Sequence, residues 1–350
     1  MFILKGKGLS KEWNGKTLFR NIDIAFRKGE HLALFGRNGA GKTTLLNGLL
    51  GKVPFDAGTV ERFVPADHWG ILEQDPDYSL SITVMAFVQS AAGKVFELKR
   101  QMEALHMQSE MDMEKYTDIY SAFLDHDGYQ LEPEAENALH QVKLPSSVWD
   151  QPYDQLSGGQ KTRAQLARLI LQKPECIIMD EPTNHLDKGT IEWLEEWLVH
   201  YSGAVLFVSH DRYFLDRTAD AILELSPDSC KRYEGGYTAY RNQKEVERRT
   251  QEMLYQKQQK RKEALLNTIR NYQQWFQQAH KAAGQNDFAR SKAKKNVSRF
   301  KAKEKELERL EKNQVKKPQA DQKVNVRLDD AYFSARRLVR IEQLSFAYGR

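Results

Sequence analysis

The chain has 350 residues, 40% hydrophobic and 29% charged, which suits about two domains with buried cores. No uncharged apolar run approaches the ~18 residues of a membrane-spanning helix, and residues 1–8 lack the apolar core of a signal peptide. Two cysteines, Cys176 and Cys230, are too few for a disulfide framework, which favours a reducing, cytoplasmic setting. These features argue against an integral membrane protein, a secreted mini-domain and a disordered tail.

The net charge of +5 hides a strong asymmetry along the chain. Residues 241–317 hold 22 Lys and Arg against 9 Asp and Glu, a net charge of +13, while the remainder has a net charge of −8. A basic segment attached to an acidic body indicates a polyanionic partner for that segment. A solvated helical spacer explains the same charge, so charge alone leaves both interpretations open.

Residues 1–240 alternate between strand and helix patterns. Short apolar runs predict strands at 22–26, 31–35, 176–179 and 204–208. Helical patterns lie between these runs, at 159–172 and 188–201. This alternation predicts an α/β domain with a parallel sheet covered by helices. Residues 94–127 instead carry apolar side chains at helical spacing only, which predicts an inserted helical arm, with a pair of core helices as the alternative.

Residues 241–318 predict a long antiparallel helical hairpin. Gly and Pro are nearly absent, and Gly284 separates two apolar stripes, so we expect the chain to fold back at 283–287 as a coiled coil. Arms of roughly 40 residues would reach about 60 Å, and Pro318 would end the second helix. Leu9-Ser10 is followed by Trp13, four residues after the leucine, and Leu344-Ser345 is followed by Tyr348 at the same spacing. This repeat predicts that residues 319–350 are the start of a second copy of the first domain.

Residues 36–43 read Gly-Arg-Asn-Gly-Ala-Gly-Lys-Thr, a phosphate-binding loop between a predicted strand and a predicted helix. Glycines let backbone N–H groups surround phosphate oxygens, and the helix N-terminus favours negative charge. Lys42 suits the β- and γ-phosphates, and the Thr43 hydroxyl suits Mg²⁺. The candidate nucleotide-binding residues here are Gly36, Asn38, Gly39, Ala40, Gly41, Lys42, Thr43 and Thr44.

The apolar run 176–179 leads directly into two carboxylates. A buried strand would deliver Asp180 to Mg²⁺ beside the phosphate-binding loop. Glu181 then follows as a candidate general base for the attacking water. An Asp-Glu pair is also common at an ordinary strand end, so this pair is not diagnostic by itself.

Residues 156–160, Leu-Ser-Gly-Gly-Gln, resemble the signature of the ATP-binding cassette family, and residues 1–240 resemble that family in motif order. The resemblance implies ATP and Mg²⁺ as ligands. It places Trp13 at the adenine, Gln74 at Mg²⁺ and water, and His210 at the γ-phosphate, with Glu181, His210 and Gln74 as catalytic residues and Thr43, Gln74 and Asp180 at the metal. It also implies that Ser157, Gly158, Gly159 and Gln160 close on ATP held by an opposing cassette, so two domains enclose two nucleotides.

Three features resemble the ABC-F group, soluble cassette proteins that act on ribosomes. They are the strings at 181–187 and 209–215, the signature helix beginning at 160–163, and the order of cassette, basic hairpin and second cassette. The resemblance implies a cytoplasmic, ribosome-associated ATPase without a membrane partner, acting in translation, with ribosome protection against antibiotics as one form of this activity. The hairpin tip, residues 272–292, would then approach ribosomal RNA and the P-site transfer RNA.

The candidate RNA-contacting residues at and beyond this tip are Trp275, Arg290, Lys292, Lys294 and Lys295. Packing within the coiled coil is the alternative for Trp275. The chain stops before a second phosphate-binding loop, so we expect a fragment of a longer protein or a chain that pairs with another copy. Two other functions stay open: the ATPase subunit of a membrane transporter, and a DNA-associated coiled-coil ATPase.

Overall fold

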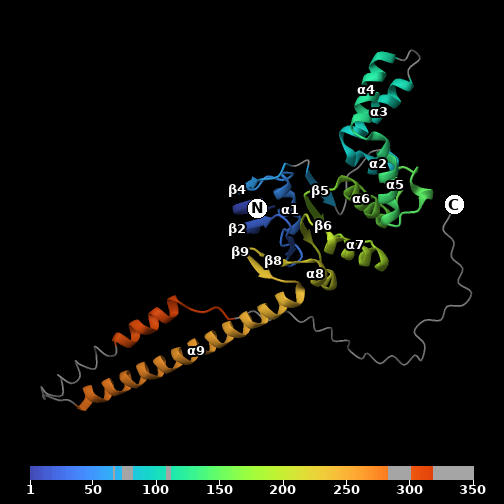
Figure 1. Cartoon of the computed structure of the whole chain (residues 1–350). Coiled ribbons are helices and arrows are strands. Elements are labelled where there is room, and N and C mark those ends of the chain that lie inside the picture. Colours follow the sequence, from blue (N-terminus) through green and yellow to red (C-terminus); the bar gives the residue numbers. More distant parts are fainter. Residues whose placement is uncertain (66–67, 73–81, 108–111, 283–300, 318–350) are drawn as a thin grey trace, which may run out of the picture. The chain divides into compact units, whose positions relative to one another are not determined.

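The computed structural model describes residues 1–65, 68–72, 82–107, 112–282 and 301–317. The chain divides into two compact units, Met1–Val246 and Glu247–Arg350. Figure 1 shows the first unit as strands and helices in layers.

A three-stranded antiparallel sheet opens the first unit. Its strands lie in the order β2-β1-β4, with β1 at Phe2–Trp13, β2 at Lys16–Arg27 and β4 at Ala57–Arg62. The predicted run 22–26 belongs to β2, where alternate side chains are buried, as in a strand with one face on a core. The turn at Lys28-Gly29 therefore carries the chain from this sheet into the next one.

The second sheet has six strands in the order β5-β6-β7-β3-β8-β9. All neighbours pair in parallel except β8 and β9. The strands are β3 (His31–Phe35), β5 (Trp69–Leu72), β6 (Cys176–Asp180), β7 (Ala204–Val208), β8 (Ala221–Ser226) and β9 (Ser229–Glu234). The predicted parallel sheet is confirmed, and its strands 31–35, 176–179 and 204–208 lie next to one another.

Both faces of this sheet are covered. Leu32 and Leu34 of β3 pack with the antiparallel sheet and helix α1 (Lys42–Leu50), while Ala33 packs on the other side with helices α6 (Gly158–Gln172) and α7 (Lys188–His200). Burial on both faces explains why the strands read as continuous apolar runs. Helix α8 (Arg212–Thr218) follows β7 and contributes Phe214 and Leu215 to the same core.

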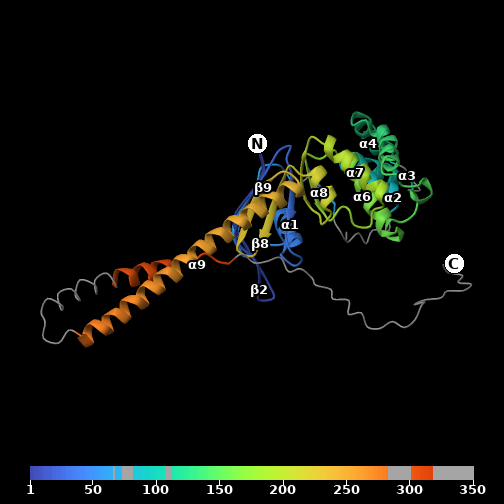
Figure 2. The same ribbon diagram turned by 90° about the horizontal axis from the view of Figure 1, so that it is seen from below.

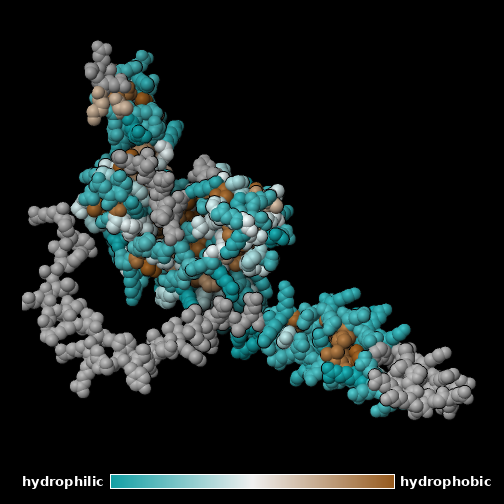
Figure 3. Space-filling model, turned by 180° about the vertical axis from the view of Figure 1, so that it is seen from behind, coloured by the Kyte–Doolittle hydropathy of each residue, from teal (hydrophilic) through white to brown (hydrophobic). Residues whose placement is uncertain are grey.

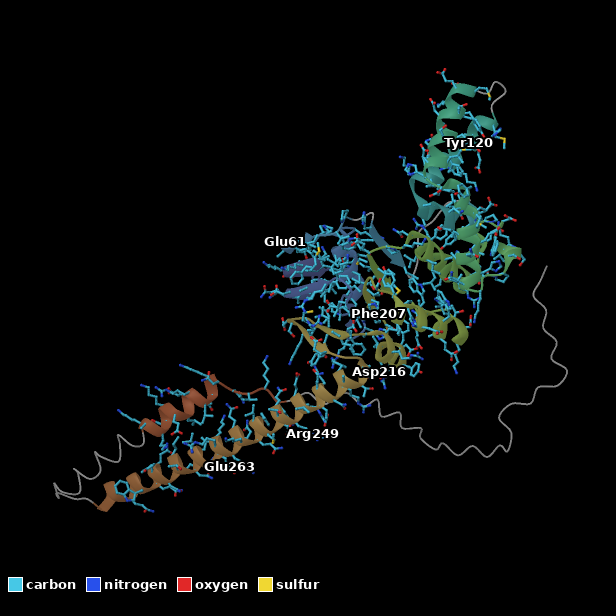
Figure 4. The ribbon with its side chains drawn as sticks, viewed as in Figure 1. Glu61, Tyr120, Phe207, Asp216, Arg249 and Glu263 are labelled. Atoms are coloured by element: carbon cyan, nitrogen blue, oxygen red, sulfur yellow. The ribbon has the colours of Figure 1, made fainter. Side chains whose placement is uncertain are left out.

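The predicted arm contains two helices, α3 (Lys94–His106) and α4 (Met113–Asp125), which lie side by side in Figure 1. They follow α2 (Val84–Gln89) and precede α5 (Leu131–Gln141), which pack on α6. The ring of His106 meets that of Tyr116 with centroids 5.0 Å apart, and only Leu105 and Ile119 of the two helices are buried. Tyr120 is exposed on α4 (Figure 4). This exposure favours an inserted arm over a pair of core helices.

Helix α9 runs from Tyr237 to Ala282, and residues 301–312 form a second helix. In the second unit the two helices are antiparallel: Lys262 pairs with Glu311 at 2.8 Å, Arg261 pairs with Glu306, and the Gln258 amide donates to the Asn313 carbonyl at 2.8 Å. The visible surface of this unit is largely hydrophilic (Figure 3), with charged side chains such as Arg249 and Glu263 along α9 (Figure 4). The expected fold-back at 283–287 and the expected second cassette at 319–350 lie outside the described residues.

Of the described helices, none is long and apolar enough to cross a membrane.

Candidate nucleotide-binding site

Three neighbouring strands end at the same edge of the parallel sheet and bring the predicted site residues together. Strand β3 leads into the loop at 36–41, β6 ends at Asp180, and β7 ends just before Ser209-His210. Val208 of β7 pairs with Asp180 on one side and with Leu34 on the other. Ligands of open α/β sheets bind outside such carboxyl ends of strands.

A cleft of about 530 Å³ lies at this edge, a volume in the range of small-molecule sites. The predicted residues that line it are Trp13, Asn38, Gly39, Gly41, Lys42, Thr43, Thr44, Asp180, Glu181 and His210. Gly36 and Ala40 belong to the same loop without lining the cleft, and Gln74 lies outside the described residues. Leu18, Asn184 and Val208 complete the lining. Trp13 is 57% exposed, so its ring is available to a planar group at the rim.

The loop turns into helix α1 at Gly41, whose φ of +88° is a conformation that favours glycine. A Cβ at this position would lie 3.0 Å from the Leu18 Cβ, a tight contact that adds to the preference for glycine. Lys42, the first residue of α1, donates from Nζ to the carbonyl oxygens of Gly36 and Arg37 at 3.1 and 3.3 Å. Burial lowers the pKa of Lys42, while Glu181 and Asp180 act in the opposite direction. The ammonium group is thus held over the loop whose N–H groups suit phosphate.

Asp180 fits a cation site. Its carboxylate accepts a hydrogen bond from the Thr43 side chain, yet burial dominates and raises the pKa of Asp180. Among the described residues, its Oδ1 is buried and has no hydrogen-bond partner. A buried, unpartnered carboxylate oxygen beside a hydroxyl is the donor set that Mg²⁺ takes alongside phosphate oxygens. Asp180 and Thr43 would hold that ion, which would neutralise charge on the phosphates.

Glu181 lies against His210. Its Oε1 is 3.2 Å from His210 Nε2, and its Oε2 accepts from the His210 backbone N–H at 3.3 Å. Burial raises the pKa of Glu181, and His210 opposes that shift. The backbone of Glu181 has φ +49°, an uncommon value for a side chain of this size. Such strained positions concentrate at functional sites, where the surrounding structure holds them.

The signature residues lie elsewhere, at the start of α6. Ser157 caps the helix: its Oγ accepts from the Gln160 N–H at 3.4 Å, and its own N–H donates to the Gln160 side chain at 2.9 Å. This reciprocal pair is a capping box. Ser157 and Gly158 are exposed, and none of residues 157–160 lines the cleft. The structure therefore does not bring the signature to the phosphate-binding loop of the same unit.

The remaining predicted residues fall in the second unit. Trp275 of α9 is 38% exposed. Arg290, Lys292, Lys294 and Lys295 lie outside the described residues. Leu18 and Val208 also line the cleft, and the sequence did not predict them. An apolar residue in a strand looks the same in the sequence whether it packs in the core or lines a cleft. Asn184 was not predicted as a site residue either, although its place within the 181–187 string, close after Asp180, was an available signal.

Comparison with known proteins agrees with this geometry. Residues 19–184 match the family described as ABC transporter. Two solved structures share the fold at 20% identity: an ATP-binding subunit of an ABC transporter, with a TM-score of 0.52 over 69% of this chain and 92% of that one, and a nucleotide-free ATP-binding cassette from an ABC transporter, with a TM-score of 0.50 over 69% and 94%.

Curated relatives extend the similarity beyond the first unit. The ATP-binding protein YdiF of Bacillus subtilis is 32% identical over 99% of this chain and 52% of its own length. The energy-dependent translational throttle protein EttA of Escherichia coli is 33% identical over 81% and 50%, and that of Haemophilus influenzae is 35% identical over 66% and 42%. The chain thus spans about half the length of the curated relatives it matches. ATP and Mg²⁺ are the ligands of ABC ATPase domains, and residues 19–184 of this chain match such a domain.

Proposed function

We propose that this chain is part of an ABC-F protein, an ATPase that uses ATP binding and hydrolysis to act on the ribosome during translation. The observation that carries this proposal is the basic segment, since residues 241–317 have a net charge of +13. A relative named as a translational throttle supports it, because that match covers 81% of the chain and so extends beyond the cassette. Cations spaced along a long helical hairpin suit a phosphate backbone.

Within the cassette, the residues of the cleft would divide nucleotide binding, Mg²⁺ binding and activation of water among them. Lys42 and the loop N–H groups bind the β- and γ-phosphates, and Thr43 and Asp180 hold Mg²⁺. Glu181, desolvated and held by His210, orients and deprotonates the attacking water. Its raised pKa makes it a better proton acceptor than an exposed glutamate once it is ionised. Gln74 belongs to the same proposed site.

The exposed signature supports a composite site. Because residues 157–160 lie away from the cleft, they would close on the nucleotide of an opposing cassette. ATP would then join two cassettes, and hydrolysis would release them. The opposing cassette would come from the rest of a longer chain or from a second copy. Protection of the ribosome against antibiotics is one activity that such a cycle could support.

The test uses the full-length protein with Glu181→Gln and the matching change in its second cassette. Glutamine is nearly isosteric but cannot accept the proton, so ATP should stay bound and the protein should remain on ribosomes. Ribosome pelleting across a salt series measures this, with and without alanine at Arg290, Lys292, Lys294 and Lys295. The four alanines should weaken pelleting and reduce the salt slope by ~0.7–0.9 for each phosphate that is no longer neutralised.

Binding to duplex DNA instead of ribosomes would support the DNA-associated ATPase. Binding to membranes instead of ribosomes would support the transporter subunit.

A further inference from the structure

The ring of Phe35 joins the His210 side chain to the first turns of helix α9. Phe35 is the last residue of β3 and directly precedes the phosphate-binding loop. Its ring centroid lies 6.5 Å from that of His210, 5.8 Å from that of Tyr237 and 5.4 Å from that of Tyr240. The interplanar angles of 60–64° correspond to edge or tilted packing, the arrangement that aromatic rings prefer. One ring therefore contacts both a cleft-lining side chain and the helix that leaves the cassette.

The α9 side of this contact is fixed by hydrogen bonds. Tyr240 is 7% exposed, and its hydroxyl donates to Glu224 Oε1 at 2.9 Å. Glu224 is the residue that pairs with Phe35 across strands β3 and β8. Burial is the main cause that raises the pKa of Tyr240, so its hydroxyl remains a neutral donor. Phe35 and Glu224 are neighbours on paired strands, and Glu224 binds the Tyr240 hydroxyl. The strand pair therefore fixes the ring of Tyr240 beside the ring of Phe35.

A second connection runs through helix α8, which begins just after His210. Asp216 of α8, labelled in Figure 4, is one of the residues that make it. Its carboxylate accepts from the backbone N–H and the hydroxyl of Thr238, both at 2.6 Å. The guanidinium of Arg212 lies 5.3 Å from the Tyr237 ring centre. Figure 2 shows the start of α9 beside β8 and β9, where the Gln243 amide donates to the Glu234 carbonyl at 2.9 Å. The first turns of α9 are thus attached to helix α8, which follows His210, and to strands β8 and β9.

We propose that Phe35 is a positioning residue for His210, and that the cluster Phe35, Tyr237 and Tyr240, termed here the aromatic cluster, couples the nucleotide state to the start of α9. The inference rests on the proposed function, in which His210 contacts the γ-phosphate. When the His210 ring exchanges its Glu181 contact for a phosphate, its edge moves against Phe35. Packed interiors yield in discrete rearrangements, so Tyr237 and Tyr240 must adjust with it.

Coupling of this kind is reciprocal. If a γ-phosphate changes the order of the first turns of α9, then altering those turns must change the preference for a nucleoside triphosphate over a diphosphate. A tyrosine that served the fold alone would leave that preference unchanged. This difference separates positioning from a purely structural role.

The experiment uses the 350-residue chain with Mg²⁺ and either ADP or the non-hydrolysable analogue AMP-PNP. Nucleotide affinities are measured by titration calorimetry, and amide hydrogen exchange is followed at residues 237–246. In the wild type, we expect AMP-PNP and ADP to give different exchange in this segment. Phe35→Leu and, separately, Tyr237→Leu should remove the difference and change the AMP-PNP to ADP affinity ratio by about fivefold or more. Phe35→Tyr retains the ring and should restore both.

Tyr213→Leu is the matched control, because Tyr213 is a 63% exposed tyrosine of α8 whose hydroxyl accepts from Arg217. Identical exchange of residues 237–246 with AMP-PNP and ADP in the wild type would overturn the inference while leaving nucleotide binding intact. An effect of Tyr213→Leu equal to that of Tyr237→Leu would also overturn it. Failure of the wild type to bind either nucleotide would contradict the proposed function itself and remove the inference with it.

Discussion

A Cβ atom on Gly159 would lie 2.6 Å from the backbone oxygen of His185, while one on Gly158 would meet nothing closer than the His185 ring at 3.6 Å. The two adjacent glycines of the signature therefore differ in what they pack against. Gly159 allows the start of α6 to lie directly on the turn at 181–187, which carries Glu181 at one end. Gly158 faces outward and is exposed.

The first prediction separates these glycines. Gly159→Ala should lower the free energy of unfolding by about 1–3 kcal/mol, because the backbone oxygen of His185 must move. Gly158→Ala should be neutral or stabilise the domain by up to ~1 kcal/mol, since alanine favours helix over glycine. Chemical denaturation of both variants measures the difference, and equal unfolding midpoints would contradict the contact between α6 and the 181–187 turn.

The second prediction concerns Lys42. Lys42→Ala should weaken Mg-ATP binding by about 10- to 150-fold, because a hydrogen bond from a charged group contributes about 1.5–3 kcal/mol and every 1.4 kcal/mol is tenfold. Titration calorimetry measures the dissociation constant. Lys188→Ala is the control, since Lys188 is 90% exposed at the start of α7 and should leave the affinity unchanged. Wild-type affinity in Lys42→Ala would disprove the assignment of the loop.

The third prediction concerns the pH dependence of stability. Burial raises the pKa of Asp180 above its unfolded value, so the protonated form stabilises the fold. That contribution is complete below the unfolded pKa of about 3.9 and is lost as the pH rises through the higher folded pKa. Asp180→Asn keeps the neutral form at every pH. It should therefore unfold at a higher temperature than the wild type near neutral pH, and the difference should vanish on acidification.

Thermal unfolding without nucleotide, from about pH 3 to pH 8, measures this effect. The same variant should lose Mg²⁺-dependent stabilisation by ATP, because asparagine offers one neutral carbonyl oxygen in place of a carboxylate. A wild type that is more stable than Asp180→Asn at neutral pH would show that Thr43 and Lys42 outweigh the cost of burying the charge.

The fourth prediction concerns the second unit. Gln258 of α9 donates to the carbonyls of Asn313 and Leu310 at 2.8 and 3.4 Å, and its Oε1 accepts from the Val315 N–H at 2.8 Å. Gln258→Leu should destabilise the pairing of the two helices by about 1–3 kcal/mol, since each of the two hydrogen bonds at 2.8 Å contributes ~0.5–1.5 kcal/mol. Hydrogen exchange at 301–317 should rise accordingly.

Gln256→Leu is the control for that variant. The Gln256 amide donates to Glu252 at 3.0 Å, one turn away on α9, and within the described part of the chain Gln256 makes no hydrogen bond to the second helix. Exchange at 301–317 should match the wild type. If both variants accelerated exchange equally, the effect would come from the helicity of α9 and not from the bridging side chain.

The local features of this protein follow from residues that are neighbours in the sequence. Gly41-Lys42 predicts a helix start after a phosphate-binding loop, and continuous apolar runs predict buried strands, because backbone dihedral preferences and burial patterns are encoded in neighbouring residues. The sequence also predicts the reactive side chains that follow β3 and end β6, namely Lys42, Asp180 and Glu181.

Which of these strand ends meet depends on the order of the strands in the folded sheet. Strand β3 lies between β7 and β8, so Phe35 comes beside His210 and Tyr240, although the sequence separates the three widely. The structure also places the signature, at the start of α6, away from the cleft. Gly158 and Gly159 are indistinguishable as a motif, and only their packing against His185 separates them. The physical reason is that strand order and close packing arise from contacts between distant residues, which local patterns do not specify.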